Sequence, residues 1–174
     1  ECLREQFREF IFMERKTMMQ VEKPVREFVS GEDVGKEQIR IAADLSLSVE
    51  QKDIVMRGHA IECRINAEDP SRNFMPCPGT IENIHLPGGN GVRIDTAVFN
   101  GYQIPPNYDS MIMKGIVYDK DRASAIAKMR STLGEVVIEG VQTNLDFQYD
   151  ILNQKDFVEG NVTTHFIPEH YDMD

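Results

Sequence analysis

A strict alternation of side chains over residues 58–69 (GHAIECRINAED) constrains the fold more than any other feature of the sequence. One set of alternate positions holds His59, Ile61, Cys63 and Ile65. The positions between them hold Ala60, Glu62, Arg64 and Asn66. Successive side chains of a β-strand point to opposite faces, so this period of two predicts a half-buried strand.

The segments that follow predict an α+β fold. Further strands are expected at residues 80–85, 92–98, 111–118 and 136–141, separated by turns rich in glycine and proline. A helix is expected from residue 121, because Ile126, Met129 and Leu133 share one helical face. Another is expected over residues 144–152, with Asn144 as its cap. The sequence thus predicts a mostly antiparallel sheet centred on residues 58–118, with helices on each side.

The N-terminal third is less regular. The apolar residues 10–13 (FIFM) indicate a buried strand, and Pro24 favours a loop over residues 20–26. Residues 33–43 predict a helix capped by Asp33, and Ser48 with Gln51 three positions later predicts a capping box for a short second helix.

Composition excludes several classes of protein. The chain has 174 residues, enough for one domain with a core or a domain plus a short segment, and its net charge of −10 argues against binding to nucleic acid. Three cysteines without a CxxC pair predict reduced thiols in a cytoplasmic protein, and no histidine–cysteine spacing fits zinc. No apolar run reaches the roughly 18 residues of a membrane span. The charged start without an initiator Met suggests that the chain begins inside a longer protein.

Candidate chemistry begins in residues 14–27 (ERKTMMQVEKPVRE). Glu14 follows the apolar strand, a usual place for a carboxylate that binds a metal ion in a nucleotide site. Glu22 stands beside Lys23, and a cation next to a carboxylate can tune it as a base. The alternative is that both glutamates are solvated charges on a loop.

A second candidate is the segment LPGGNGVRIDT, residues 86–96. Its glycines could let the backbone approach a ligand while Arg93 is directed at an anion. The alternative is a tight turn followed by a surface arginine. Glu62 and Arg64, which share one face of the predicted strand, could form a structural ion pair.

Several motifs in order resemble those of the biotin carboxylase family, in its C-terminal domain. They are RGHAIECRINAEDP at 57–70, PxPGxI at 76–81, PGGxGVRxD at 87–95, GYxIPPxYDSMIxK at 101–114, GVxTN at 140–144 and TTHF at 163–166. The forms RINAED and IPPxYDSM are most similar to the acetyl-CoA carboxylase branch, which serves fatty acid synthesis.

The resemblance implies an ATP-dependent ligase that carboxylates biotin on its carrier protein, using bicarbonate and Mg²⁺ or Mn²⁺. It implies the carrier protein, carboxyltransferase subunits and a second copy of the chain as partners. It also implies roles for individual residues: Glu14 binds the metal, Glu22 deprotonates bicarbonate, Gln20 and Val21 line the bicarbonate pocket, Arg93 stabilises the biotin oxyanion, and His165 lies toward the nucleotide. Residues 1–55 would be a remnant of an ATP-grasp domain, and residues 56–174 the C-terminal domain.

Two departures from the family pattern affect the expected site. Lys16 stands where the family has Asn near the metal, and Met18 stands where it has the Arg that binds bicarbonate. A cation repels Mg²⁺, and methionine cannot make a charge-assisted hydrogen bond. The ATP-binding half of the family is absent, so the isolated chain is expected to be inactive and to bind no cofactor tightly. The alternative is a truncated, non-catalytic paralogue that serves as an assembly module.

Overall fold

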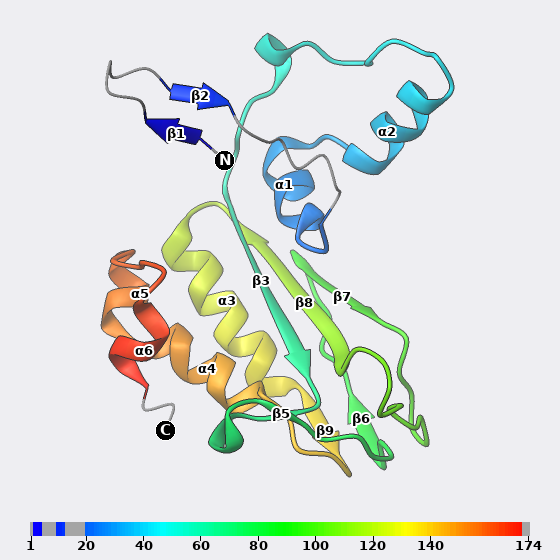
Figure 1. Cartoon of the computed structure of the whole chain (residues 1–174), viewed down its shortest axis with the longest axis vertical. Coiled ribbons are helices and arrows are strands. Elements are labelled where there is room, and N and C mark those ends of the chain that lie inside the picture. The colour runs from blue at the N-terminus through cyan, green and yellow to red at the C-terminus, as the bar shows by residue number, and fades with distance from the viewer. Residues whose placement is uncertain (1, 5–9, 13–19, 172–174) are drawn as a thin grey trace.

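The centre of the fold is a three-stranded antiparallel sheet in the order β3-β8-β7 (Figure 1). The computed structural model describes residues 2–4, 10–12 and 20–171. The sheet consists of β3 (His59–Asn66), β8 (Met111–Asp119) and β7 (Val92–Thr96). The predicted strands at these places are confirmed, and the alternation of residues 59–66 determines which side chains face the core.

Helix α3 (Arg122–Glu135) packs on the apolar face of this sheet. Its residues Met129 and Leu133 join Ile65, Met113 and Val117 in the core. The predicted helical face is therefore confirmed. Asp121 caps the helix, and its carboxylate accepts a hydrogen bond of 2.8 Å from the backbone N–H of Ser124. Cys63, in the same core, has its pKa raised to about 12 by burial, so the thiol stays protonated.

Shorter elements surround the sheet. Three two-stranded pairs are β1 (Cys2–Arg4) with β2 (Phe10–Phe12), β4 (Glu68–Asp69) with β5 (Met75–Pro76), and β6 (Asn83–His85) with β9 (Val137–Glu139). After α3 the chain forms the helices α4 (Leu145–Asn153), α5 (Lys155–Glu159) and α6 (Phe166–His170). Two 3₁₀ turns lie at Gln51–Asp53 and Pro70–Arg72. The strand predicted at residues 80–85 is confirmed in part, as β6, with an isolated bridge at Thr80. It lies outside the central sheet, because β6 pairs with β9.

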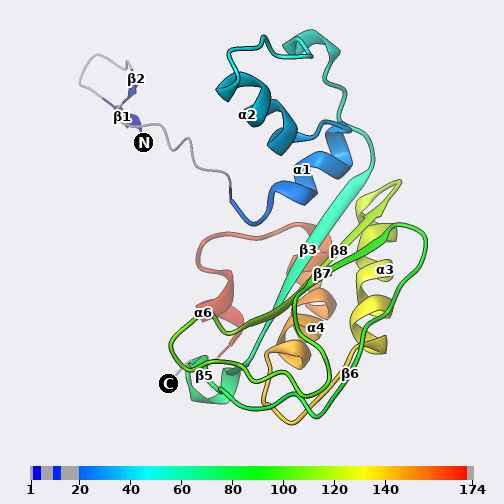
Figure 2. The same cartoon turned by 90° about the vertical axis from the view of Figure 1, so that its right-hand side faces the viewer.

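The opposite face of the sheet is partly covered by α1 (Lys23–Ser30), which is followed by α2 (Val34–Ala42) (Figure 2). The predicted loop over residues 20–26 is wrong, because α1 begins at Lys23 with Pro24 in its first turn. Proline is tolerated there, since the N–H groups of the first turn have no partner within the helix. The ring of Phe28 stacks on Tyr118 of β8 at 6.0 Å between centroids, which joins α1 to the sheet.

The caps predicted at Asp33 and Ser48 have different outcomes. Asp33 does cap α2, accepting a bond of 2.9 Å from the N–H of Lys36. Ser48 is not a cap: its hydroxyl donates to Glu37 over 2.6 Å, and the capping box of the 3₁₀ turn is formed by Glu50 and Asp53.

Asn144 stands at the start of α4, yet its side chain makes no cap bond to that helix. Its Oδ1 accepts from the N–H of Asn66 at 2.9 Å, and its backbone N–H donates to the Asn66 carbonyl at 3.2 Å. The buried residue therefore binds the end of β3, which would otherwise have unpaired backbone groups.

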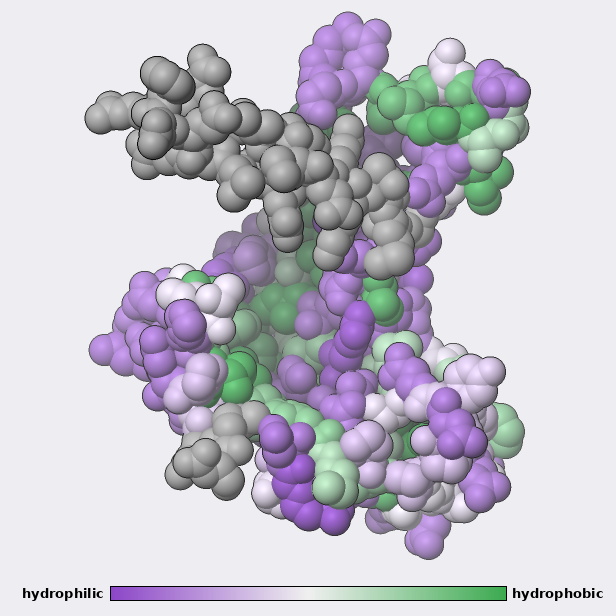
Figure 3. Space-filling model, viewed as in Figure 1, coloured by the Kyte–Doolittle hydropathy of each residue, from purple (hydrophilic) through white to green (hydrophobic). Residues whose placement is uncertain are grey.

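The surface over α2 is unusually apolar for an exposed helix (Figure 3). Ile39 is 72% exposed, and Ile41, Leu45 and Leu47 are each more than half exposed. None of the helices that the structure describes combines the length and the hydrophobicity required to cross a bilayer.

Gly58 lies directly before β3, where the end of β8 packs closely against it. Its φ is +64°, and an added Cβ would lie 2.4 Å from the carbonyl oxygen of Asp119 and 2.6 Å from the hydroxyl of Tyr118. We expect Gly58→Ala to lower the free energy of unfolding by about 3 kcal/mol or more, measured by chemical denaturation. Gly160→Ala is the matched control: its φ is +83° with no atom in the way, so only about 1 kcal/mol should be lost. Equal losses would contradict the close contact at residue 58.

His170 of α6 bonds to Asp156 of α5, and the strength of this contact depends on the protonation of the histidine. Its Nδ1–H donates to the Phe166 carbonyl at 2.9 Å and its Nε2–H donates to the Asp156 carboxylate at 2.9 Å, and these two contacts raise the pKa of His170. A raised histidine pKa stabilises the folded state below the unfolded value of about 6.5, and this contribution is lost as the pH rises through the folded value. Hydrogen exchange of α6 should therefore accelerate, relative to α3, between pH 6 and pH 8. The variant His170→Gln should remove most of that difference, and an unchanged pH dependence would contradict the assignment.

Candidate functional site

The sheet face opposite α3 carries charged side chains from all three strands, in two rows. In one row Asp95 of β7, Lys114 of β8 and Arg64 of β3 are directly opposite one another. Residues that oppose each other in antiparallel strands point to the same face, so these side chains are neighbours.

In the second row, Arg93 and Glu62 lie on either side of Ile116. Ile116 is fully buried, which shows that this part of the polar face is covered. The sheet face therefore combines three cations and two carboxylates on a partly desolvated surface.

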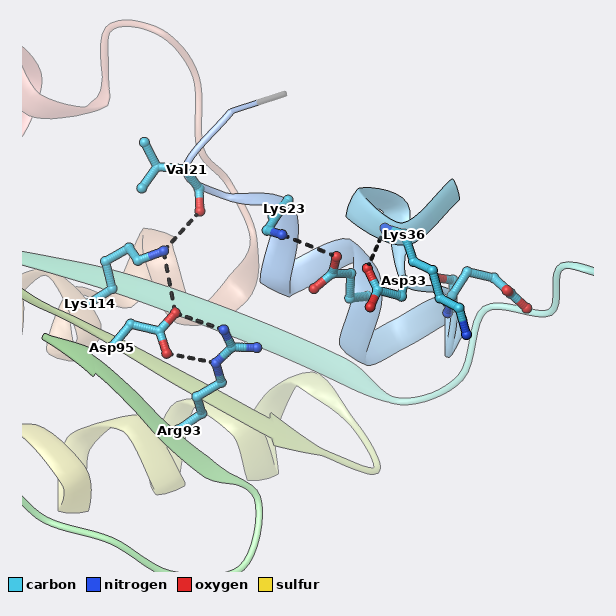
Figure 4. A network of polar contacts seen from close by, with 10 residues as sticks. Val21, Lys23, Asp33, Lys36, Arg93, Asp95 and Lys114 are labelled. Atoms are coloured by element: carbon cyan, nitrogen blue, oxygen red, sulfur yellow. Dashed lines mark hydrogen bonds and ion pairs between the residues drawn. The ribbon is translucent and has the colours of Figure 1, made fainter. Parts of the chain in front are cut away.

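Arg93 is held by a carboxylate of its own strand (Figure 4). Its Nε donates to Asp95 Oδ1 at 2.7 Å, and its Nη2 donates to Asp95 Oδ2 at 2.9 Å. The guanidinium lowers the pKa of Asp95, and the carboxylate raises the pKa of Arg93. Two of the five donors of Arg93 are thus engaged by Asp95, and no described residue accepts a hydrogen bond from the other three.

Lys114 connects this pair to the segment before α1. Its Nζ lies 3.5 Å from Asp95 Oδ2 and donates to the backbone carbonyl of Val21 at 3.3 Å (Figure 4). The lysine side chain is only 13% exposed. The ammonium group of Lys114 thus contacts Val21, a residue 93 positions earlier in the sequence.

Glu22 is held over the same face by Arg64. The Nη2 of Arg64 donates to Glu22 Oε1 at 2.8 Å, and both side chains are about half exposed. The sequence suggested instead that Arg64 pairs with Glu62; the structure contradicts this, because Arg64 bonds Glu22. Burial raises the pKa of Glu62, whose carboxylate oxygens receive no hydrogen bond from the part of the chain described.

The structure brings some of the predicted site residues together and separates another. Glu22, Val21 and Arg93 meet the same charged face, and Gln20 is exposed just before them, with its carbonyl accepting from the Lys23 N–H at 3.2 Å. His165 is exposed at the start of α6, where its N–H donates to Thr163 Oγ1 at 3.1 Å. The described contacts do not link it to the charged face.

The predicted metal ligand Glu14 lies outside the described residues, as do Lys16 and Met18. Over residues 20–171 no three histidine, cysteine or carboxylate side chains gather in a way that could hold a metal ion. The described face therefore offers cations for an anionic ligand and a carboxylate for a proton, but it offers no metal-binding cluster.

Sequence reasoning missed the parts of the site that depend on strand register. Lys114 and Asp95 were not predicted to take part, and Arg64 was assigned to another partner. The sequence predicts strands at residues 92–98 and 111–118, but it does not show which strands pair with each other. Only the pairing of Asp95 with Lys114, and of Lys114 with Arg64, shows that the faces form one surface.

Comparisons with known proteins identify relatives of this chain. The family model described as the biotin carboxylase C-terminal domain matches residues 62–169. The biotin carboxylase of Pseudomonas aeruginosa is 48% identical over 165 residues, which are 95% of this chain and 36% of the relative. Biotin carboxylase 1 of Bacillus subtilis is 52% identical over 164 residues, covering 94% of this chain and 36% of the relative. A pyruvate carboxylase subunit of Methanothermobacter thermautotrophicus is 49% identical, covering 93% of this chain and 33% of the relative.

The solved structures that match this chain come from the same family of proteins. The biotin carboxylase domain dimer of Hydrogenobacter thermophilus 2-oxoglutarate carboxylase, in complex with MgADP, ADP and bicarbonate, matches with a TM-score of 0.88 and 44% identity. That match covers 97% of this chain and 37% of the solved chain. The chain thus spans about a third of the length of the curated relatives it matches.

Proposed function

The chain belongs to the biotin carboxylase C-terminal domain family, and we propose that it forms the C-terminal part of the biotin carboxylase component of a biotin-dependent carboxylase. The observation that carries the proposal is the ion pair of Glu22 with Arg64 on a face that also holds Arg93 and Lys114. Such a face supplies a carboxylate that can take a proton and cations that can hold an anion.

In the proposed reaction, bicarbonate attacks the γ-phosphate of ATP and releases ADP. Glu22 accepts the bicarbonate proton, which makes the oxygen a nucleophile. The resulting carboxyphosphate breaks into CO₂ and phosphate. The released phosphate takes the proton of the biotin ureido N–H, and that nitrogen bonds to the CO₂ carbon. In this proposal Gln20 and Val21 would line the bicarbonate pocket, His165 would lie toward the nucleotide, and Glu14 would be a ligand of Mg²⁺.

A fixed cation is needed where negative charge develops on the biotin oxygen. The family resemblance assigns this role to Arg93. The contacts favour Arg64 as a second candidate, because Arg64 already touches the proposed base, whereas Arg93 is engaged by Asp95. The two arginines therefore need to be compared directly.

The domain division follows from the same proposal. Residues 1–55 would belong to an ATP-grasp domain, and residues 56–174 to the C-terminal domain. The family match begins at residue 62, and the exposed apolar side chains over α2 are those expected of a helix that another part of a longer protein covers. The biotin carrier protein, carboxyltransferase subunits and a second copy of the chain are the proposed partners, in the cytoplasm.

The acetyl-CoA carboxylase branch, and with it fatty acid synthesis, is the finer proposal. The sequence forms RINAED and IPPxYDSM support it. The competing function is a non-catalytic assembly module, which the replacements Lys16 and Met18 favour.

The first test joins the chain to the part of the Bacillus subtilis relative that it does not cover. The 174-residue chain alone should show no bicarbonate-dependent ADP release, because phosphoryl transfer needs groups that position the phosphates. The unmodified chimera should be nearly inactive. The double change Lys16→Asn and Met18→Arg should raise its rate by about one to two decades, since a charge-assisted hydrogen bond contributes roughly 1.5–3 kcal/mol. Full activity without the double change would show that the two replacements are tolerated.

In the restored chimera, Glu22→Gln should abolish most carboxylation of free biotin. Arg64→Ala and Arg93→Ala, compared at equal protein concentration, then identify the oxyanion cation: its loss should lower kcat by about two decades, while loss of the other should cost less. Glu139→Gln, an exposed carboxylate of β9, is the control and should leave the rate unchanged. A restored chimera that folds but remains inactive would favour the assembly module.

A further inference from the structure

Glu62 is the one carboxylate of the charged face to which no described residue donates a hydrogen bond. Both of its oxygens are inaccessible to solvent, although the side chain as a whole is only half-buried. An ionised carboxylate in such a place lowers stability, because it gives up water without gaining donors. Burial accordingly raises its pKa.

The charges that face Glu62 come from all three strands and from the segment before α1. Lys114 and Arg64 favour its ionised form, and Glu22 and Asp95 oppose it. The two opposing carboxylates have direct partners: Asp95 binds Arg93, and Glu22 binds Arg64. Glu62 is thus excluded from the ion pairs that its neighbours form.

Arg64 has a donor that matches this acceptor. Its Nη2 is bound to Glu22, but its Nε is buried and finds no acceptor among the described residues. Glu62 and Arg64 project from the same face of β3, separated only by the inward-facing Cys63. An orphaned donor and an orphaned carboxylate therefore lie next to each other on one strand, and a rotation of the arginine side chain could join them.

We propose that Glu62 is a positioning residue, an alternative partner that takes the Arg64 guanidinium when Glu22 loses its negative charge. The functional meaning rests on the proposed function, in which Glu22 gains a proton from bicarbonate. The exchange itself requires only that Glu22 become neutral. Glu62 then keeps Arg64 on the sheet and paired, instead of releasing it to solvent.

The test uses the 174-residue chain with Glu22→Gln, which mimics neutral Glu22. The readout is hydrogen exchange of the Arg64 Nε–H by nuclear magnetic resonance, with the signal identified by its loss in Arg64→Lys. We expect exchange in Glu22→Gln to be slower by about tenfold than in the double variant Glu22→Gln/Glu62→Gln, the effect of one charge-assisted hydrogen bond. With Glu22 intact, Glu62→Gln should change this rate little. Equal rates in the single and the double variant would overturn the proposal.

Thermal unfolding gives an independent readout that a merely structural Glu62 would not produce. In the unmodified chain, Glu62→Gln removes an unpaired buried charge and should leave the midpoint unchanged or raise it. In the Glu22→Gln background the same substitution should lower the midpoint, because a pair is then lost. A lowered midpoint in both backgrounds would contradict the exchange, and Glu139→Gln serves as the matched carboxylate control. Neither measurement needs catalysis, so failure of the proposed enzyme activity would be distinguished from failure of this inference.

Discussion

The antiparallel pairing of β3 with β8 is the interaction on which the rest of the structure depends. The register runs from His59 opposite Asp119 to Asn66 opposite Met111. It directs Cys63 and Ile65 toward α3, and it directs Glu62 and Arg64 toward the opposite face. A slip of one residue would exchange the two faces, burying charges under α3 and exposing the core. One pairing thus determines both the core and the composition of the candidate site.

Much of the fold could be predicted, because local patterns specify it. The alternation of residues 59–66, the apolar face of α3 and the Asp33 cap each depend on near neighbours in the sequence. The errors have equally physical causes. Pro24 was interpreted as a helix breaker, although the first turn of a helix accepts proline. The partner of β6 is a strand more than fifty positions away, and no local pattern reports such a pairing.

In the candidate site, too, the sequence predicts what depends on near neighbours and misses contacts between distant residues. Resemblance identified Glu22 and Arg93 as candidates, and both lie on the charged face. The partners of these residues could not be predicted. Arg93 is bound within its own strand, so its position is settled as soon as β7 forms. Arg64 bonds a residue 42 positions away, so its position depends on how the segment before α1 docks on the sheet. The two arginines therefore depend on different parts of the fold, although they lie on one surface.

The bonds of Asn144 to the edge of the sheet affect how two molecules can associate. Among the described strands β3 is an edge strand of the three-stranded sheet, and an edge strand presents backbone groups with which a foreign strand can pair. At Asn66 both backbone groups of that edge are already bound, the N–H to the Asn144 side chain and the carbonyl to the Asn144 N–H. An incoming strand could extend the sheet there only by first displacing the start of α4. A single buried asparagine thus protects this end of the sheet against edge-to-edge aggregation.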